Sequence, residues 1–111
     1  MRFSIAKQFT DTPGPRYRKQ GDFSGEEFRE EFLWPMYERY EKTGECNIID
    51  LDGVFGYPTS FLEEAFGGLA RVLSPERVKE AFTFESLEQP GIIEEIYSDI
   101  NNAKKRWGIV R

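Results

Sequence analysis

The chain has 111 residues and a mass of 13.0 kDa, so a single domain over residues 1–111 is expected. Hydrophobic residues make up 39% of it and aromatic residues 15%, which is enough for one apolar core and excludes a disordered chain. The net charge of −5 disfavours non-specific binding to nucleic acids and to anionic membranes, because like charges repel.

The counts of histidine and cysteine narrow the chemistry further. Histidine is absent, which removes the commonest general base, the commonest metal ligand and every Ser-His or Cys-His pair. Cys46 is the single cysteine, so a reducing, cytoplasmic location and a packed thiol are expected. The first residues do not resemble a signal peptide, and no apolar run is long enough to span a membrane. We expect no cofactor and no metal ion.

The N-terminal part predicts a strand, a turn and a second, short strand. Apolar and polar residues alternate at the start of Arg2–Phe9 (RFSIAKQF), which indicates a half-buried strand. Pro13-Gly14-Pro15 predicts a turn. The segment Arg16–Arg18 behind it is predicted as an edge strand that ends before Gly21.

A helix is predicted to begin at Ser24 and to end at Gly44. Ser24 and Glu27 have the spacing of a capping box, in which the serine hydroxyl accepts a backbone N–H and the glutamate reaches back. Apolar residues follow at helical spacing: Phe28, Phe32, Leu33, Met36, Tyr37 and Tyr40. Pro35 removes one backbone hydrogen bond, so the helix should kink or restart there.

The middle of the chain predicts a strand, a turn and a second helix. Neighbouring apolar residues in Cys46–Leu51 (CNIIDL) indicate the central strand of a sheet, covered on both faces. A turn over Gly53–Pro58 leads to a helix that begins at Thr59 or Ser60. The predicted buried stripe of this helix is Phe61, Leu62, Ala65, Phe66, Leu69, Val72 and Leu73. Gly67-Gly68 within it predicts close backbone packing or an early helix end.

The C-terminal part predicts a short helix, a strand and a long helix. Ser74 before a proline begins a helix over Pro75–Glu80, and alternation in Ala81–Glu85 (AFTFE) indicates a strand. Isoleucines at helical spacing predict a helix over Pro90–Trp107 with Gly108 as its C-cap. This order predicts an α/β fold, with a small, mostly parallel or mixed sheet of about four strands packed against three to four helices.

Asp50 and Asp52 raise a first functional hypothesis. An apolar strand followed by Asp-x-Asp-Gly-Val resembles the opening motif of haloacid-dehalogenase-like phosphotransferases. That resemblance implies Asp50 as nucleophile, Asp52 as general acid and Mg²⁺ as cofactor. The motif lies near mid-chain, however, and Lys79 and Asp99 fall in predicted helices and not at further strand ends. A phosphohydrolase is therefore the alternative, and the same residues are also typical of an ordinary strand-ending turn.

A second resemblance covers most of the chain. Ile48–Val72 (IIDLDGVFGYPTSFLEEAFGGLARV) resembles the strand, turn and helix of STAS domains, which are named after sulfate transporters and anti-sigma-factor antagonists. Together with GDFSGEEFREEFLWPMYERY before it, this segment is similar to a bacterial STAS-like family of unknown function. The resemblance extends over about residues 2–105.

The STAS resemblance implies a non-enzymatic regulatory module that binds a protein partner. In phospho-regulated STAS domains, a histidine-kinase-like ATPase phosphorylates a serine at the start of this helix, which switches partner binding. Ser60, with Thr59 beside it, matches the phosphoacceptor position. Pro58 stands in place of the usual acidic residue, and Phe61 in place of the usual glycine. The alternative is that Ser60 only caps the helix, with Glu63 completing a capping box.

The expected contact surface is the turn before this helix and the first turn of the helix itself. Its residues are Gly56, Tyr57, Pro58, Glu63 and Glu64, with the two glutamates as exposed specificity residues. The expected partner is a histidine-kinase-like ATPase or another signalling protein, and the oligomeric state stays open. A third hypothesis, phosphate or nucleic-acid binding by Arg16–Lys19 (RYRK), is disfavoured by the acidic composition.

Overall fold

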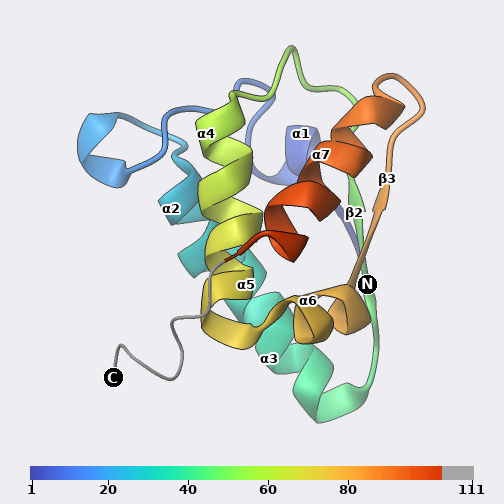
Figure 1. The fold of residues 1–111 in the computed structure, drawn as a ribbon. Helices are drawn as coiled ribbons and strands as arrows, with labels where there is room; N and C mark the ends of the chain where they lie inside the picture. Colours follow the sequence, from blue (N-terminus) through green and yellow to red (C-terminus); the bar gives the residue numbers. More distant parts are fainter. Residues whose placement is uncertain (104–111) are drawn as a thin grey trace.

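The computed structural model describes residues 1–103, in which three parallel strands form one sheet (Figure 1). The strands are β1 (Arg2–Ser4), β2 (Asn47–Asp50) and β3 (Phe82–Glu85), in the order β1-β2-β3. The predictions of a parallel sheet, of a central strand in the middle of the chain and of the strand around Phe82 are confirmed. The prediction of about four strands is wrong for the described residues, which contain three.

The missing strand is the one predicted for Arg16–Arg18. The backbone of this segment binds the start of a helix, because the Gly25 N–H donates to Pro15 O (2.9 Å) and the Glu26 N–H to Arg16 O (3.0 Å). The chain then closes into the 3-10 turn η1 (Arg18–Gln20). These hydrogen bonds hold the segment against the helix, away from the edge of the sheet.

The first crossover between strands is one continuous helix made of α2 (Gly25–Phe28), the π turn η2 (Arg29–Leu33) and α3 (Trp34–Thr43). The Ser24 hydroxyl accepts the Glu27 N–H (3.0 Å), and Gly44 (φ 75°) ends the helix, so both predicted ends are confirmed. The helix continues through Pro35, with the change to π hydrogen bonding directly before it. A proline lacks the N–H that a regular α turn would use, and the π turn accommodates that loss.

The second crossover contains another long helix, made of α4 (Thr59–Leu62), the π turn η3 (Glu63–Gly67) and α5 (Gly68–Leu73). Close packing at the glycine pair is confirmed. A Cβ at Gly67 would lie 3.3 Å from Asp99 O, and one at Gly68 would lie 2.7 Å from Arg29 Nη1. Val72, predicted in the buried stripe, is 50% exposed. Leu69 and Leu73, which also follow the π turn, are buried as predicted, so Val72 is the one member of the predicted stripe that faces outward, where it lines a groove with Trp34.

Three shorter helices complete the described chain: α1 (Ile5–Gln8), α6 (Pro75–Ala81) and α7 (Pro90–Asn101). The predicted strand 2–9 ends early, because the Ser4 hydroxyl accepts the Lys7 N–H (3.2 Å) and starts α1. This extra turn gives five helices in the described residues, where three to four were expected. Asn102 and Ala103 are not helical, so α7 is shorter than predicted. The rest of that prediction, 104–107 with Gly108, lies outside the described residues.

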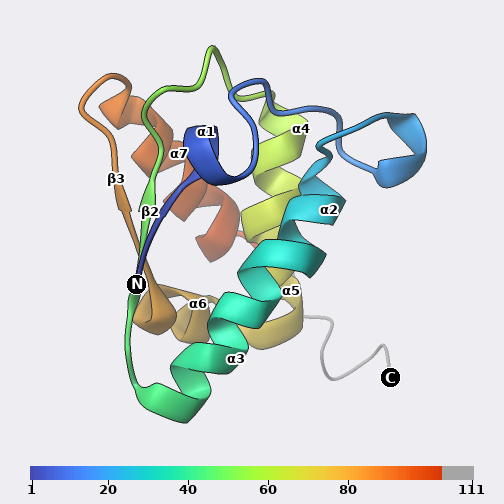
Figure 2. The same ribbon diagram turned by 180° about the vertical axis from the view of Figure 1, so that it is seen from behind.

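The helices pack on one face of the sheet (Figures 1 and 2). Phe3, Ile49 and Phe84 are paired across the three strands and are buried, whereas their strand neighbours Thr83 and Glu85 are exposed. Phe3 lies 6.0 Å from Phe28 of α2, ring centre to ring centre, and Phe84 lies 5.4 Å from Tyr97 of α7. The expectation of a central strand covered on both faces is therefore wrong.

The core lies between this sheet face and the helices. Its fully buried large side chains are Ile5, Phe28, Leu33, Ile49, Leu51, Phe61, Leu62, Phe66, Leu69, Phe82, Ile96 and Ile100. Cys46, expected as a packed thiol, is exposed because it precedes β2 and lies outside this layer. Within residues 1–103, no helix combines the length and the apolar character that a membrane crossing requires.

Candidate functional site

The carboxyl ends of the parallel strands meet at one end of the molecule, at the top of Figure 1. Three loops lie there: the segment after α1 that contains Asp11, the loop 51–58 after β2, and the loop 86–89 after β3. We call this region the sheet edge. In open α/β sheets, ligands and partners bind at the carboxyl ends of the strands.

Asp52 ties two of these loops together. Its carboxylate accepts the Ser86 hydroxyl (2.9 Å), the Leu87 N–H (2.9 Å) and the Glu88 N–H (3.1 Å). Glu88 also joins the two loops: its Oε1 accepts the Gly53 N–H (2.9 Å). The backbone N–H groups of Leu87 and Glu88, followed by the Ser86 hydroxyl, lower the pKa of Asp52 by stabilising its charged form. Asp52 is therefore a charged acceptor that shapes the loop after β3.

Asp50 is engaged in the same way. Its Oδ1 accepts the Asp52 N–H (3.0 Å), and its Oδ2 lies 3.6 Å from Arg2 Nη2. A general acid needs a raised pKa, which is the opposite of the shift at Asp52. Lys79 lies in α6, where its ammonium donates to Asn101 (2.6 Å). Residues 1–103 hold no group of three side chains that could ligate a metal ion. Both aspartates thus accept hydrogen bonds within the loops after β2 and β3.

The turn after β2 is anchored at both of its ends. Gly53 has φ 87°, a left-handed conformation that favours glycine. The Phe55 N–H donates to Asp11 O (3.0 Å), and the Tyr57 hydroxyl donates to Leu51 O (2.7 Å). Burial, and then the charges of nearby acidic groups, raise the pKa of Tyr57. The predicted contact residues of this turn therefore differ: Gly56 and Pro58 are exposed, and Tyr57 is half-buried.

Two large apolar side chains project from the tied loops. Phe55 is 84% exposed and Leu87 is 94% exposed. We call these two residues the edge pair. Sequence reasoning missed both, because each lies in a short loop outside every helical or strand periodicity. The available signal was the presence of a large apolar residue among turn residues, Phe55 before Gly56 and Leu87 between Ser86 and Glu88.

The two predicted phosphoacceptors lie at the start of α4. Pro58 occupies the N-cap position, and its carbonyl accepts the N–H groups of Phe61 (3.1 Å) and Leu62 (3.2 Å). The prediction that Ser60 caps the helix is wrong, because Ser60 lies inside the first turn and no side chain caps this end. Thr59 is exposed and Ser60 is half-buried.

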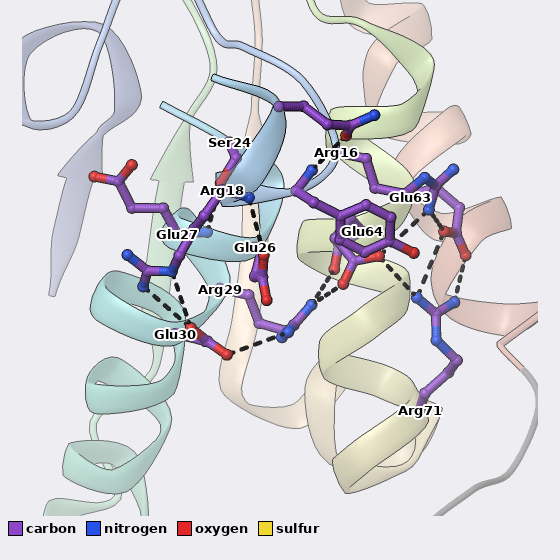
Figure 3. Close-up of polar contacts among 12 residues, drawn as sticks. Arg16, Arg18, Ser24, Glu26, Glu27, Arg29, Glu30, Glu63, Glu64 and Arg71 are labelled. Atoms are coloured by element: carbon purple, nitrogen blue, oxygen red, sulfur yellow. Dashed lines mark hydrogen bonds and ion pairs between the residues drawn. The ribbon is translucent and has the colours of Figure 1, made fainter. Parts of the chain in front are cut away.

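Glu63 and Glu64 lie away from the sheet edge, in a charged cluster between two helices (Figure 3). The cluster consists of Arg16, Arg29, Arg71, Glu63 and Glu64. Arg16 and Arg71 both bind Glu63, and Arg29 binds Glu64. The Glu64 side chain is only 9% exposed, so the expectation of two exposed specificity residues is wrong. The expectation was based on the position of the two glutamates one turn after Ser60. That position does not show that arginines from other parts of the chain bind them.

The cluster also supports the π turn η3. Arg29 Nη1 donates both to the Glu64 carboxylate and to the Glu64 backbone carbonyl (3.1 Å), whose environment the π turn has changed. Burial opposes ionisation of Glu63, but hydrogen bonds from Arg71 and Arg16 outweigh it and lower the pKa of Glu63. The absence of a Cβ at Gly68 leaves space for the Arg29 guanidinium. These contacts hold η2, η3, α5 and the segment that contains Arg16 together.

Asp99 of α7 borders the charged cluster. Its Oδ2 is shielded from solvent and has no hydrogen-bond partner in the described part of the chain, and the same holds for Glu95 Oε2. Burial, followed by the charges of Glu63 and Glu95, raises the pKa of Asp99 to about 6, against the opposing effect of Arg16 and Arg71. A carboxyl group that prefers to be protonated is expected to weaken the fold at neutral pH.

Comparison with known families supplies one match. The model of a family described as a STAS-like domain of unknown function matches residues 24–91, more than half of the chain. This match confirms the resemblance seen in the sequence, over a shorter range than the expected 2–105. It spans α2 to the start of α7 and includes the loops after β2 and β3. Neither the curated proteins nor the solved structures contain a match to the chain.

Proposed function

Because the chain belongs to the family of STAS-like domains of unknown function, we propose that it is a non-enzymatic module that binds a protein partner at its sheet edge. One observation carries the proposal: Phe55 and Leu87 are almost fully exposed on two loops that Asp52 ties together. A single exposed apolar residue is ordinary, but two on loops joined by hydrogen bonds add apolar area whose burial favours association.

The chemistry of the sheet edge supports binding over catalysis. The two aspartates there accept hydrogen bonds from neighbouring loops, and Asp52 has a lowered pKa. Exposed apolar side chains on anchored loops lose little freedom on binding, because the backbone is already ordered by the contacts of Gly53 and Phe55. The proposed contact surface keeps Gly56, Tyr57 and Pro58 and replaces Glu63 and Glu64 with the edge pair.

The partner proposed from the STAS resemblance is a signalling protein, with a histidine-kinase-like ATPase as the first candidate. The test is affinity capture from an extract of the source cells, followed by mass spectrometry and by calorimetry with the purified partner. Three baits are compared: the wild type, Phe55→Ser/Leu87→Ser, and Val72→Ser. Val72 is the matched control, since it is an exposed apolar residue that lines a groove with Trp34 and Leu69, away from the edge.

We expect the partner to bind the wild type and Val72→Ser equally, and to bind Phe55→Ser/Leu87→Ser at least about tenfold more weakly, as for loss of apolar anchors at an interface. Equal affinity for all three baits would overturn the sheet edge as the binding surface. Loss with Val72→Ser alone would move the surface to the groove beside Trp34.

Regulation by phosphorylation at Thr59 or Ser60 is a second part of the proposal. Neither hydroxyl caps the helix, and Thr59 is exposed next to the turn of the sheet edge. A phosphate there adds a charge of about −1.5 to −2, enough to change partner affinity. The test is incubation with the candidate kinase and ATP, read by mass spectrometry on the wild type, Thr59→Ala and Ser60→Ala. A partner-binding kinase that leaves both residues unmodified would remove this part and leave the binding proposal standing.

A further inference from the structure

The acidic residues of the sheet edge surround the edge pair without being neutralised. Asp11 is exposed on the loop that binds the Phe55 N–H, and Glu88 is exposed beside Leu87. Asp52 lies between them and accepts hydrogen bonds from neutral donors. Lys7 lies in α1, at the same end of the sheet, and forms no ion pair with these carboxylates among the described residues.

Several acidic residues elsewhere in the described chain are in ion pairs. Glu30 and Glu31 pair with Arg18, Glu45 pairs with Arg39 and the N-terminal amine, and the charged cluster holds Glu63 and Glu64. At the strand ends, Asp50 and Glu85 both pair with Arg2. Asp50 Oδ2 lies 3.6 Å from Arg2 Nη2, and Glu85 Oε1 lies 2.6 Å from Arg2 Nη1. Asp11, Asp52 and Glu88 have no ion-pair partner among the described residues, so negative charge stands on the loops that carry the exposed apolar side chains or next to them.

Tyr57 lies close enough to three of the sheet-edge carboxylates for their charges to act on it. It lies behind the turn that carries Phe55, and three carboxylates of the sheet edge, Asp50, Asp52 and Glu88, act together to disfavour its ionised form after burial. Acidic side chains therefore stand next to the turn that carries Phe55 and beside Leu87. Their negative charge attracts cations and repels anionic ligands.

From this arrangement we infer that the partner presents a basic segment, in which lysine or arginine flanks an apolar or aromatic anchor that packs on Phe55 and Leu87. The inference rests on the proposed function and specifies the chemistry of its partner. The apolar contact supplies affinity through surface burial, and the charges steer the encounter and select the partner. Nucleic acids, acidic peptides and phosphorylated segments are repelled from the same surface.

The test is selection of random peptides displayed on phage against the immobilised full chain. Enriched peptides are synthesised and their affinities are measured by fluorescence anisotropy for the wild type, for Phe55→Ser/Leu87→Ser and for Val72→Ser. Two charge variants complete the set: Asp11→Asn, and Glu88→Gln, whose amide oxygen still accepts the Gly53 N–H. Each affinity is measured at 50 and 300 mM NaCl.

We expect the peptides that require the edge pair to carry a net positive charge and an apolar anchor. Their affinity should fall about tenfold between the two salt concentrations, and about threefold in each charge variant, because exposed charges act through a screened field. Peptides that require the edge pair but are neutral or acidic would overturn the basic partner and leave the proposed function in place. Peptides that bind equally without the edge pair, or no enrichment at all, would count against both.

Discussion

The sheet edge and the charged cluster are both rich in acidic residues, but their surroundings differ. In the charged cluster, arginines from three separate parts of the chain bind Glu63 and Glu64, and the Glu64 side chain is 9% exposed. At the sheet edge, Asp52 and Glu88 accept N–H and O–H groups, and exposed apolar side chains lie beside them. The first arrangement connects helices, whereas the second leaves charge and apolar surface open to a partner.

Acidic residues therefore have two different roles in this fold: those of the charged cluster stabilise it, and those of the sheet edge are proposed to face a partner. Removing one member of a buried ion pair leaves an uncompensated charge and destabilises the fold, while removing an exposed loop residue has little effect on stability. We therefore expect substitutions in the charged cluster to lower the free energy of unfolding strongly, and substitutions of the edge pair to change it little.

The largest loss of stability is expected for Glu64→Ala. The substitution removes the more buried of the two carboxylates that the Arg29 guanidinium binds and leaves only Glu30, 3.6 Å away, which should lower the unfolding free energy by about 3–5 kcal/mol. Urea unfolding followed by circular dichroism measures this loss. The control is Glu45→Ala, which breaks a pair whose side chains are half-exposed and should cost less than about 1 kcal/mol. Equal losses in the two variants would contradict the division into structural and exposed acids.

A smaller loss is expected where α2 approaches α4. A Cβ at Gly25 would lie 2.6 Å from Phe61 O, a backbone atom that cannot move by a change of rotamer. We expect Gly25→Ala to lower the unfolding free energy by about 1–3 kcal/mol. The control is Gly91→Ala in α7, where a Cβ meets nothing within 4 Å and alanine should be neutral or stabilising by up to about 1 kcal/mol.

The third effect depends on pH and concerns Asp99 beside the charged cluster. Its pKa is about 6 in the folded state and 3.8 without the surrounding structure, so the folded state retains a proton that the unfolded state loses. The contribution of Asp99 to stability therefore falls as the pH rises from about 4 to 6 and stays low above that. The full shift in the pKa of Asp99 corresponds to about 3 kcal/mol of unfolding free energy. Because Asp99 is partly exposed, solvent screening reduces this loss to the order of 1 kcal/mol.

Asp99→Asn isolates this contribution. Asparagine cannot ionise, so the variant should be more stable than the wild type above pH 7, by about 4–8 °C in melting temperature. The advantage should shrink toward pH 4, where the wild-type carboxyl is protonated. Melting curves of both proteins at matched pH values cancel the opposite pH dependence of Glu63 and Asp52, whose pKa values are lowered. A difference that is constant across this range would contradict the role given to Asp99.

The smallest effect on stability is expected for Phe55→Ser/Leu87→Ser. Both side chains are exposed by more than four fifths, so their replacement should change the unfolding free energy by less than about 0.5 kcal/mol. Urea unfolding checks this directly. A loss above 2 kcal/mol would show that the edge pair belongs to the core and would undermine its use as a binding surface.

The local elements could largely be predicted from short sequence patterns. The Ser24 and Ser74 caps, the glycine end of the first helix and the strand at Phe82 each depend on residues within one or two turns of one another. The family resemblance was equally accessible, since it depends on a continuous run of residues. The predictions that failed needed information from elsewhere in the chain. The segment Arg16–Arg18 pairs with the start of α2, and Val72 lies at the exposed margin of its helix.

The sequence by itself determined most of the helices, the parallel strands and the family, because apolar periodicity and capping act over a few neighbouring residues. Only the tertiary structure decided what each acidic residue does. Glu64 binds Arg29, 35 residues away, and Asp52 binds the backbone of Leu87, also 35 residues away. Burial and pairing at such separations depend on how the helices and loops pack, and no local pattern encodes them. Packing therefore placed the glutamates inside and left Phe55 and Leu87 exposed.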